Sequence, residues 1–600
     1  MAKRSNTKRK GMPEVQPQDE GVLTTEFVLH EWKLILIHAA IIIAAGLWIY
    51  SPALHGDWLG DDSLYISQNP LLNDPARLWK TWFQPGSFIE YYPLEETVQW
   101  VQWQLWGNDT FGYHLTNVIL HIVSALLVWQ LLSKFGLQIA WLGGLIFVIH
   151  PMMVESVAWI SELKNCLSLP PFLLAMCAWI DYEERGRRAD YLLALGFFLV
   201  AMLCKIGAAP LPAVILLYAW WKRGRIEWRD WLSCAPFLVI AMTLVLINLW
   251  ASSLYTHSQL NNSSVTEVGG LFFRLALAGQ TLSYYFTMCF WPLGPLPYYP
   301  QWKVDPSSLV QFLPWFVLSA AACWLWRRRR SWGRHVLLGL GFFILTLGPF
   351  LGFIPISYMD YTWVMDHFLY VPIIGLIGIV VAGIERVDVR LAASVHPFST
   401  GTLTVIIGLL ALESHWYTAA FTSAETFWNY VIDRNPGSGA AYENLGVVLL
   451  RAGDLEHAKE RFDTTIRLKP ELSEPYCNLA YVYMQQGQIP EATEALRQAL
   501  KRDPSDPVLH NNMGILLTQS GHIPEALGQF EQALRGHPFY AEAHNNMGHT
   551  LLLAKRPSEA IKQFQAALQI NPSYAAARDN LDLALAQMRY VPAGAPTRSQ

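Results

Sequence analysis

The chain has 600 residues, of which 52% are hydrophobic and only 15% are charged. A soluble protein of this length would normally carry about 25% charged residues, so the composition indicates a membrane protein. The formal net charge of −4 argues against a nucleic-acid-binding protein, and the seven cysteines include no CxxC pair that would indicate a zinc site or a disulfide framework.

The first 32 residues form a polar tail that precedes the apolar part of the chain. They begin with the basic sequence MAKRSNTKRK, which favours a cytoplasmic tail over a cleaved signal peptide. Residues 33–415 are dominated by apolar runs near the 20 residues that a membrane helix needs. The spans predicted there are 33–51, 114–133, 137–160, 166–181, 189–204, 206–221, 231–251, 309–326, 335–352, 367–384 and 399–414.

The clusters of Lys and Arg predict the orientation of these spans. If the clusters all face the cytoplasm, the acidic loop 51–113 lies outside. The chain must then cross an even number of times between Arg225 and Arg327, so one of three apolar runs does not span. We expect this to be 271–291, a re-entrant or interfacial piece, because it holds Arg274 and a proline-rich stretch follows it. The resulting 11 crossings place the C-terminal region beside the acidic loop, whereas a spanning 271–291 would place it in the cytoplasm.

The C-terminal third repeats with a period of 34 residues. Proline recurs at 470, 504, 538 and 572, and a small residue recurs at 446, 480, 514 and 548. This period, with small residues where paired helices cross, predicts four tetratricopeptide units over 439–472, 473–506, 507–540 and 541–574. Residues 416–438 read as a linker and degenerate repeat, and 575–600 as a capping helix and tail. The expected fold is therefore all-α: a polytopic membrane domain followed by an α-solenoid.

One amide ladder follows the same 34-residue period. It consists of Asn444, Asn478, Asn512 and Asn546, each two residues before the small residue of the first helix. Amide side chains that face the groove can bind the backbone of an extended peptide or protein acceptor with little sequence preference. Alternatively, asparagine is simply common at this position of the repeat.

The membrane half has polar islands that the predicted topology brings to one face. They are GDDSLYISQNPLL (60–72), EYYPLEE (90–96), LWGNDTFGYHLTNVILH (105–121), HPMMVESVAWISELKN (150–165), LCKIGAAPLP (203–212) and VMDHFLYVP (364–372). Ionisable side chains in the membrane cost free energy to bury, so their presence there indicates a functional role. Within the third island, His114, Asn117 and His121 share one helix face. This arrangement resembles a set of metal ligands, and the simpler interpretation is that the three side chains form hydrogen bonds between helices.

The order of these islands resembles the transmembrane and tetratricopeptide-repeat-containing O-mannosyltransferases, particularly their bacterial-type members. The resemblance covers roughly 55–385 and the repeats. The family pattern has an acidic pair before NP, a YRPL-like stretch, FGYHLxNxxxH, HPxxxExVAWI…K and a late Asp followed by Arg-Tyr. This chain departs from it twice, with Tyr92 in place of the Arg of YRPL and His367-Phe368 in place of Arg-Tyr. If the family's arginines neutralise donor phosphate, another cation must do so here.

The resemblance implies a GT-C glycosyltransferase that takes a sugar, mannose or another hexose, from a polyprenyl-phosphate donor. Asp61 or Asp62, with Asp62 slightly favoured, would accept the proton of a Ser or Thr hydroxyl of an extracytoplasmic protein. The pair could also hold a divalent cation, although two adjacent acids are a weak metal signal and no metal site is assigned. A structural alternative is that one Asp caps a helix that begins near Ser63.

The leaving group would be a lipid phosphate, which requires cations near the outer leaflet. The candidates for this donor site are Lys164, Lys205, Arg274, His150, His367 and its neighbour Asp366. The first four have simpler explanations. Lys205 could snorkel, Lys164 could be solvated, Arg274 could anchor the 271–291 segment, and His150, which could also pair with Glu155, could bond a backbone group freed by Pro151.

Three further functions compete with protein glycosylation. The chain could be a membrane-anchored scaffold without catalysis, or a polymerase or ligase that adds sugar to a glycan or lipid. A secondary transporter is disfavoured because no inverted repeat is visible. The expected location is a multi-pass protein of a bacterial inner membrane, with a cytoplasmic N-terminus and periplasmic repeats.

Overall fold

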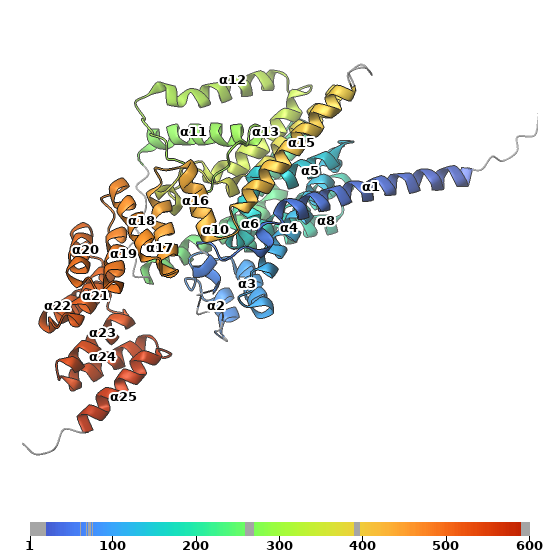
Figure 1. The fold of residues 1–600 in the computed structure, drawn as a ribbon. Coiled ribbons are helices and arrows are strands. Elements are labelled where there is room, and N and C mark those ends of the chain that lie inside the picture. Colours follow the sequence, from blue (N-terminus) through green and yellow to red (C-terminus); the bar gives the residue numbers. More distant parts are fainter. Residues whose placement is uncertain are drawn as a thin grey trace, which may run out of the picture.

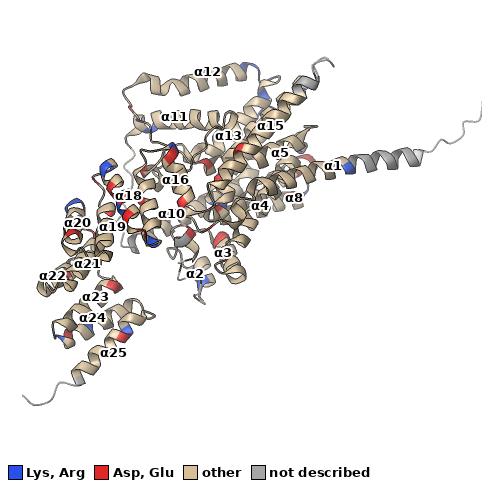
Figure 2. Ribbon diagram, in the orientation of Figure 1, with Lys and Arg blue, Asp and Glu red and all other residues tan. Residues whose placement is uncertain are grey.

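The computed structural model describes residues 20–258, 269–388 and 396–589, except residues 61, 68, 70, 71, 73 and 75. Within these residues every regular element is helical, and no strand occurs. The predicted all-α fold is therefore confirmed. Figure 1 shows a bundle of long helices from which the repeats, orange to red, lead away at one end. Charged residues are sparse on the bundle and frequent on the repeats, as Figure 2 shows.

The N-terminal two thirds of the chain form the bundle. Its helices are α1 (Glu20–Tyr50), α4 (Phe111–Lys134), α5 (Ala140–Ile149), α6 (Val154–Ala158), α7 (Leu163–Arg185), α8 (Arg188–Cys204), α9 (Leu211–Arg223), α10 (Trp228–Ser258), α11 (Leu271–Phe290), α12 (Leu313–Arg327), α13 (Gly333–Leu347), α14 (Ile373–Asp388) and α15 (His396–Ala419). Two short helices, α2 (Arg77–Phe83) and α3 (Pro93–Trp106), lie in the first loop.

Six of the described helices are long and apolar enough to cross a membrane: α1, α4, α7, α10, α12 and α13. The number rises to eight if the bent pairs α5–α6 and α15–α16 (Ala424–Arg434) each count as one span. The predicted spans near α8, α9 and α14 are helices of 17, 13 and 16 residues. They are shorter than the roughly 20 residues that a helix needs to cross a bilayer. Helix α11 is not among the six either, and the count of 11 crossings stays a prediction.

The span predicted over 137–160 is broken at His150. Helix α5 ends there, and α6 follows at an angle of 63° after a short turn over Pro151–Met153. Pro151 has no N–H for the helix, and its ring forces the preceding residue out of the helical region. His150 accordingly adopts an extended backbone with φ −76° and ψ 128°. The break turns the chain so that α6 packs against α4, α7 and α15.

Helices α7 and α8 form a tight hairpin that brings distant residues together. Gly186 ends α7 with a left-handed φ of 67°, a conformation that glycine adopts without steric cost. The next helix begins two residues later and packs along α7. The residue that follows α8 therefore returns to the first turn of α7, which places Lys205 beside Lys164.

The C-terminal part is a solenoid of helix pairs. The four predicted units contain α17 (Gly439–Arg451) with α18 (Leu455–Leu468), α19 (Glu474–Gln485) with α20 (Ile489–Arg502), α21 (Pro507–Gln519) with α22 (Ile523–Gly536), and α23 (Ala541–Leu553) with α24 (Pro557–Ile570). Helix α16 (Ala424–Arg434) precedes them and α25 (Ala575–Arg589) follows. The predicted tetratricopeptide solenoid is thus present.

The periodic small residues have a packing cause. A Cβ added to Gly514 would lie 2.7 Å from the ring of Phe530 on the partner helix, and one on Gly548 would lie 2.6 Å from Phe564. Gly446 faces Phe462 in the same way. The second unit has Ala480, and the residue at its phenylalanine position is Leu496. The size of the partner side chain therefore determines whether glycine or alanine occupies the crossing position.

The first part of the solenoid packs directly on the bundle. Asp57 N–H donates to Thr422 O at 3.0 Å, which joins the first loop to the residues before α16. The rings of Trp159 and Phe427 are 5.4 Å apart, with their planes at 62°. Residues of α16 and α17 belong to the same buried apolar cluster as the bundle. The start of the solenoid is therefore fixed against the loops that hold the polar islands.

Candidate functional site

Two lysines predicted from separate islands meet at the start of α7. The Nζ atom of Lys205 lies 2.6 Å from Asn165 Oδ1 and 3.9 Å from Glu162 Oε2. Lys164 Nζ lies 3.1 Å from Glu90 Oε2. The side chains of Lys164 and Lys205 are 22% and 12% exposed, so both can be approached from solvent. Two partly accessible cations and two carboxylates therefore share one small region, which we call the lysine cluster.

Asp62 braces the first loop against this cluster. Its Oδ1 accepts a 2.7 Å hydrogen bond from Ser161 N–H, and its Oδ2 accepts a 2.9 Å bond from Leu59 N–H. The side chain is fully buried. Ser161 directly precedes Glu162, so Asp62 fixes the turn that leads into the lysine cluster. Asp61, the other member of the pair, lies outside the described residues.

Tyr92, which stands where the resemblance expects arginine, also reaches the cluster. Its hydroxyl donates to Glu90 Oε1 at 3.3 Å, so Glu90 lies between Tyr92 and Lys164. Deeper in the same loop, Arg77 pairs with Glu96 at 2.7 Å. Burial raises the pKa of Glu96 to about 7, and the guanidinium of Arg77 opposes this rise. With Tyr92 in place of arginine, Lys164 and Lys205 are the side chains that form ion pairs with Glu90 and Glu162 among the described residues.

The second departure, His367, belongs to a buried histidine–glutamate pair. His367 Nδ1 lies 2.9 Å from Glu155 Oε1, and its backbone N–H donates to Glu155 Oε2 at 3.2 Å. Both side chains are at least nine-tenths buried. When the imidazole is protonated, the contact is an ion pair, and His367 then supplies a positive charge where the family pattern has arginine. The pairing of Glu155 with His150, considered from the sequence, does not occur.

Asp366 connects this region to the helix that leads to the repeats. Its Oδ1 accepts a 2.7 Å hydrogen bond from Tyr299, and its Oδ2 accepts a 3.1 Å bond from Tyr417 of α15. The carboxyl group is fully buried. Sequence reasoning did not single out either tyrosine, because neither lies in a polar island. Asp366 therefore ties the 291–308 segment and α15 together beside His367.

Two predicted donor-site residues bond backbone groups elsewhere. His150 Nε2 lies 3.1 Å from Cys289 O, and His150 Nδ1 accepts from Met152 N–H at 3.3 Å. These are the backbone contacts expected at a helix break. Arg274 donates from Nε to Gly269 O at 3.0 Å and from NH1 to Phe353 O at 2.9 Å, which anchors the start of α11. In both cases the structural alternative describes the contacts seen.

Asn117 and His121 of α4 make hydrogen bonds to residues far away in the sequence. Asn117 Nδ2 donates to Trp159 O at 3.2 Å, and His121 Nδ1 lies 2.9 Å from the Tyr370 hydroxyl. Among the residues that the structure describes, no group of three or more His, Cys, Asp or Glu side chains is arranged to hold a metal ion. The contacts of Asn117 and His121 are hydrogen bonds, as the simpler alternative describes.

The amide ladder lies between successive repeats. Asn478, Asn512 and Asn546 each donate from Nδ2 to the residue 35 positions earlier: Glu443 Oε1, Cys477 Sγ at 3.3 Å and Asn511 Oδ1 at 3.1 Å. Asn444 instead donates to Ala440 O of its own helix at 2.8 Å. The ladder therefore stabilises the stacking of the repeats as well as facing the groove.

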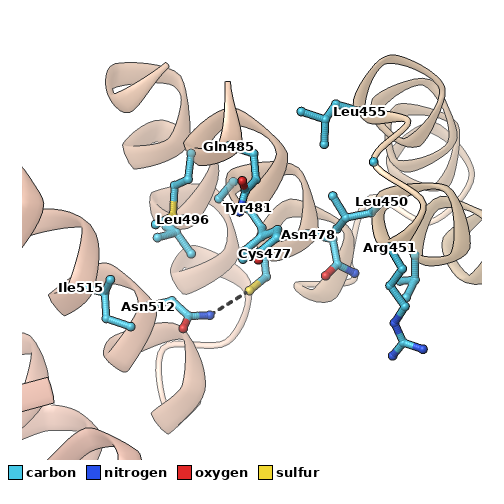
Figure 3. Close-up of a pocket in the computed structure, with 14 residues that line it drawn as sticks. Leu450, Arg451, Leu455, Cys477, Asn478, Tyr481, Gln485, Leu496, Asn512 and Ile515 are labelled. Atoms are coloured by element: carbon cyan, nitrogen blue, oxygen red, sulfur yellow. Dashed lines mark hydrogen bonds between the residues drawn. The ribbon is translucent and has the colours of Figure 1, made fainter. Parts of the chain in front are cut away.

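A pocket of about 760 Å³ opens in the groove between the first three repeats. Asn478 and Asn512 line it together with Tyr481, Met484 and Arg451 (Figure 3). The figure also shows the hydrogen bond from Asn512 to Cys477, another residue that lines the pocket. A half-buried pocket with a few amides among apolar side chains suits the backbone and side chains of an extended peptide.

Comparisons with known proteins find matches for both the membrane part and the repeats. The family model described as dolichyl-phosphate-mannose-protein mannosyltransferase matches residues 93–251. Tetratricopeptide-repeat models match residues 409–472, 480–521 and 511–575. The protein O-mannosyl-transferase Tmtc3 of Drosophila melanogaster is 23% identical over 483 residues, which is 67% of this chain and 51% of Tmtc3. The membrane part and the repeats of this chain are thus both similar to the TMTC-type protein O-mannosyl-transferases.

Two other similar proteins match shorter stretches. The protein O-mannosyl-transferase TMTC1 of Homo sapiens is 27% identical over 30% of this chain and 23% of its own length, and F38B6.6 of Caenorhabditis elegans is 27% identical over 24% and 23%. The chain thus spans about half the length of Tmtc3 and under a quarter of the other two. The solved tetratricopeptide protein YrrB is 24% identical over 26% of this chain and 80% of YrrB, with a TM-score of 0.23.

Proposed function

We propose that this TMTC-like protein is a membrane O-glycosyltransferase. It would move mannose or another hexose from a polyprenyl-phosphate donor to a Ser or Thr hydroxyl of an extracytoplasmic protein. The names of the relatives and the match of residues 93–251 support glycosyl transfer to protein. The lysine cluster supports the lipid-phosphate donor, because it gathers two accessible cations beside the loop that carries the acidic pair.

The reaction would be a substitution at the anomeric carbon of the sugar. The acceptor hydroxyl oxygen forms the new bond to this carbon as the bond to the phosphate oxygen breaks. The polyprenyl phosphate leaves with the bonding electrons, and the hydroxyl proton passes to a carboxylate of the acidic pair. Lys164 and Lys205 would bind the phosphate as its charge increases, after exchange of their present contacts with Glu90 and Glu162.

The two members of the acidic pair would then have different tasks. Both oxygens of Asp62 accept backbone N–H groups, so Asp62 suits the task of holding the Ser161 turn in place. We therefore assign the task of accepting the proton to Asp61. The buried side chains of Glu155, His367 and Asp366 would hold the donor site in place. A protonated His367 would supply the positive charge of the missing arginine.

The repeats would hold the acceptor as an extended segment. The pocket lined by Asn478 and Asn512 supplies a surface for such a segment, and α16 fixes the solenoid against the loops of the site. In this account the repeats and the acidic loop share one side of the membrane, the periplasm of a bacterium, and the N-terminal tail is cytoplasmic. A divalent cation could assist at the donor phosphate.

The proposal is tested by transfer in a defined system. The full chain in lipid nanodiscs would receive synthetic polyprenyl-phosphate sugars and peptides that contain Ser and Thr. We expect Asp61→Asn to abolish transfer with the fold intact, and Asp62→Asn to reduce both transfer and protection of the 58–67 loop. Asp57→Asn, an exposed neighbour, is the control. If no polyprenyl-phosphate sugar supports transfer to peptide but a glycan acceptor does, the polymerase alternative is correct; no transfer at all would favour the scaffold.

A further inference from the structure

A second pocket lies on the outer surface of the bundle, away from the lysine cluster. It has a volume of about 360 Å³ and lies between α9, α12 and α13. Its walls are apolar and include Leu217 and Trp220 of α9, Ala322 and Trp326 of α12, and Leu340 of α13. The rings of Trp220 and Trp326 stack at 5.4 Å with an interplanar angle of 7°. We call this pocket the apolar slot.

Four arginines stand at one end of the slot. Arg327–Arg330 directly follow Trp326, and Figure 2 shows them as the blue end of α12. The guanidinium of Arg329 lies 4.8 Å from the centre of the Trp326 ring. Arg327, Arg328 and Arg330 are exposed. The positive charge is therefore in contact with a wall of the slot.

This charge has no acidic partner in the described parts of the chain. Nearby arginines do have such partners: Arg223 pairs with Glu183 and Asp230, and Arg225 pairs with Glu227. None of the four arginines after α12 makes an ion pair with a described carboxylate. Exposed, unpaired guanidinium groups beside an apolar slot are complementary to an amphiphile with an anionic head.

The slot is remote from the proposed reaction site. Helix α9 begins six residues after Lys205 and runs for 13 residues, or roughly 20 Å, before it ends at Arg223 beside the slot. Helix α13 runs back from the arginine end toward the segment that holds Asp366. A ligand of the slot would therefore sit at the opposite end of the bundle from the lysine cluster.

We propose that the apolar slot binds an anionic phospholipid. One acyl chain would lie against the walls of the slot, and Arg327 and Arg330 would bind the phosphate. Arginine forms two parallel hydrogen bonds with phosphate oxygens. In a zwitterionic lipid, the cationic group of the headgroup partly neutralises the negative charge of that phosphate. Basic groups at the membrane surface attract anionic lipids with roughly fivefold higher affinity for each Lys or Arg. This site is independent of the proposed transfer activity.

Native mass spectrometry of the full chain in mild detergent tests the proposal. The probes are phosphatidylglycerol and phosphatidylcholine with identical acyl chains. We expect the wild type to retain phosphatidylglycerol at least about fivefold better than phosphatidylcholine. The variant R327Q/R330Q should lose this preference, and Ala322→Phe, which fills the slot, should retain less of both lipids.

The matched control is R185Q/R188Q, which removes two arginines from the turn between α7 and α8. This control should keep the preference of the wild type. Equal retention of the two lipids by the wild type would overturn the proposal. So would an equal loss of preference in the control, which would indicate general electrostatics, or unchanged retention in Ala322→Phe, which would exclude the slot.

Discussion

The Tyr417 hydroxyl donates a 3.1 Å hydrogen bond to Asp366 Oδ2 across 51 residues of sequence. This bond joins α15, the helix before the repeats, to the carboxylate beside His367. Tyr299 supplies a second bond to the same carboxylate. One buried carboxyl group therefore links α15, the helix that leads to the repeats, to the segment that holds His367.

Replacement of Tyr417 by Phe removes one of the two hydroxyl donors that hold Asp366. A buried carboxyl oxygen that loses its hydrogen-bond donor costs about 1–3 kcal/mol, so we expect a clear fall in the thermal unfolding midpoint of the detergent-solubilised chain. The control is Tyr430→Phe, which removes a 2.9 Å bond to the neutral backbone oxygen of Pro295. If the unfolding midpoint falls equally in both variants, the hydrogen bond to Asp366 contributes no more to stability than the bond to the backbone oxygen.

The two lysines of the cluster should govern the use of the donor. Lys164→Gln and Lys205→Gln keep the hydrogen-bonding reach but remove the charge. We expect kcat/KM for the lipid-linked sugar to fall about 10- to 100-fold in each, because each loses a charge-assisted contact with phosphate. Lys80→Gln, whose lysine pairs with Asp74 in the first loop, should leave donor use unchanged. Unchanged donor use in both cluster variants would remove the lysines from the donor site.

The amide ladder should bind acceptor peptide unevenly along its length. Asn478 and Asn512 line the pocket of the groove, whereas Asn444 bonds its own helix and does not line it. The double variant N478A/N512A should therefore weaken peptide binding, measured by fluorescence anisotropy with an acceptor peptide. The single variant N444A should bind like the wild type. Equal binding by all three proteins would show that the ladder only stacks the repeats.

The first repeat should become less stable as the pH rises. Burial raises the pKa of Glu443 to about 7, although the Asn478 amide opposes the rise. The folded chain then keeps a proton that the unfolded chain loses near pH 4.5, so stability falls between about pH 4.5 and pH 7. Glu443→Gln, which retains an acceptor for Asn478, should abolish this dependence. Hydrogen exchange of residues 439–485, corrected for intrinsic rates, measures it, and an unaltered pH profile in the variant would contradict the assignment.

The sequence predicted the repeats well because their constraints are local and periodic. Gly514 must be small because Phe530 lies across from it, and this pairing recurs every 34 residues. Lys164 and Lys205 could be named as candidates because charges in apolar surroundings are conspicuous. Their meeting depends on the α7–α8 hairpin, which follows from the turn at Gly186.

Other features of the site could not be predicted from local patterns. Tyr299 and Tyr417 are ordinary tyrosines in apolar stretches, and only the folded chain shows that they share Asp366. Arg274 and His150 were conspicuous in the sequence for the same reason as the lysines, yet they bond backbone oxygens. A charged residue in an apolar segment thus indicates that a polar contact is needed there. It does not show whether the side chain bonds the protein backbone or binds a substrate.

The most direct test of the central claim is glycoproteomics of the host cell. It compares wild type, the double variant Asp61→Asn/Asp62→Asn and the control Asp57→Asn at equal expression. The account predicts that a hexose mass on Ser or Thr peptides is lost in the double variant and kept in the control, which also identifies the acceptor. A glycoproteome that is the same in all three strains would contradict protein glycosylation by this chain.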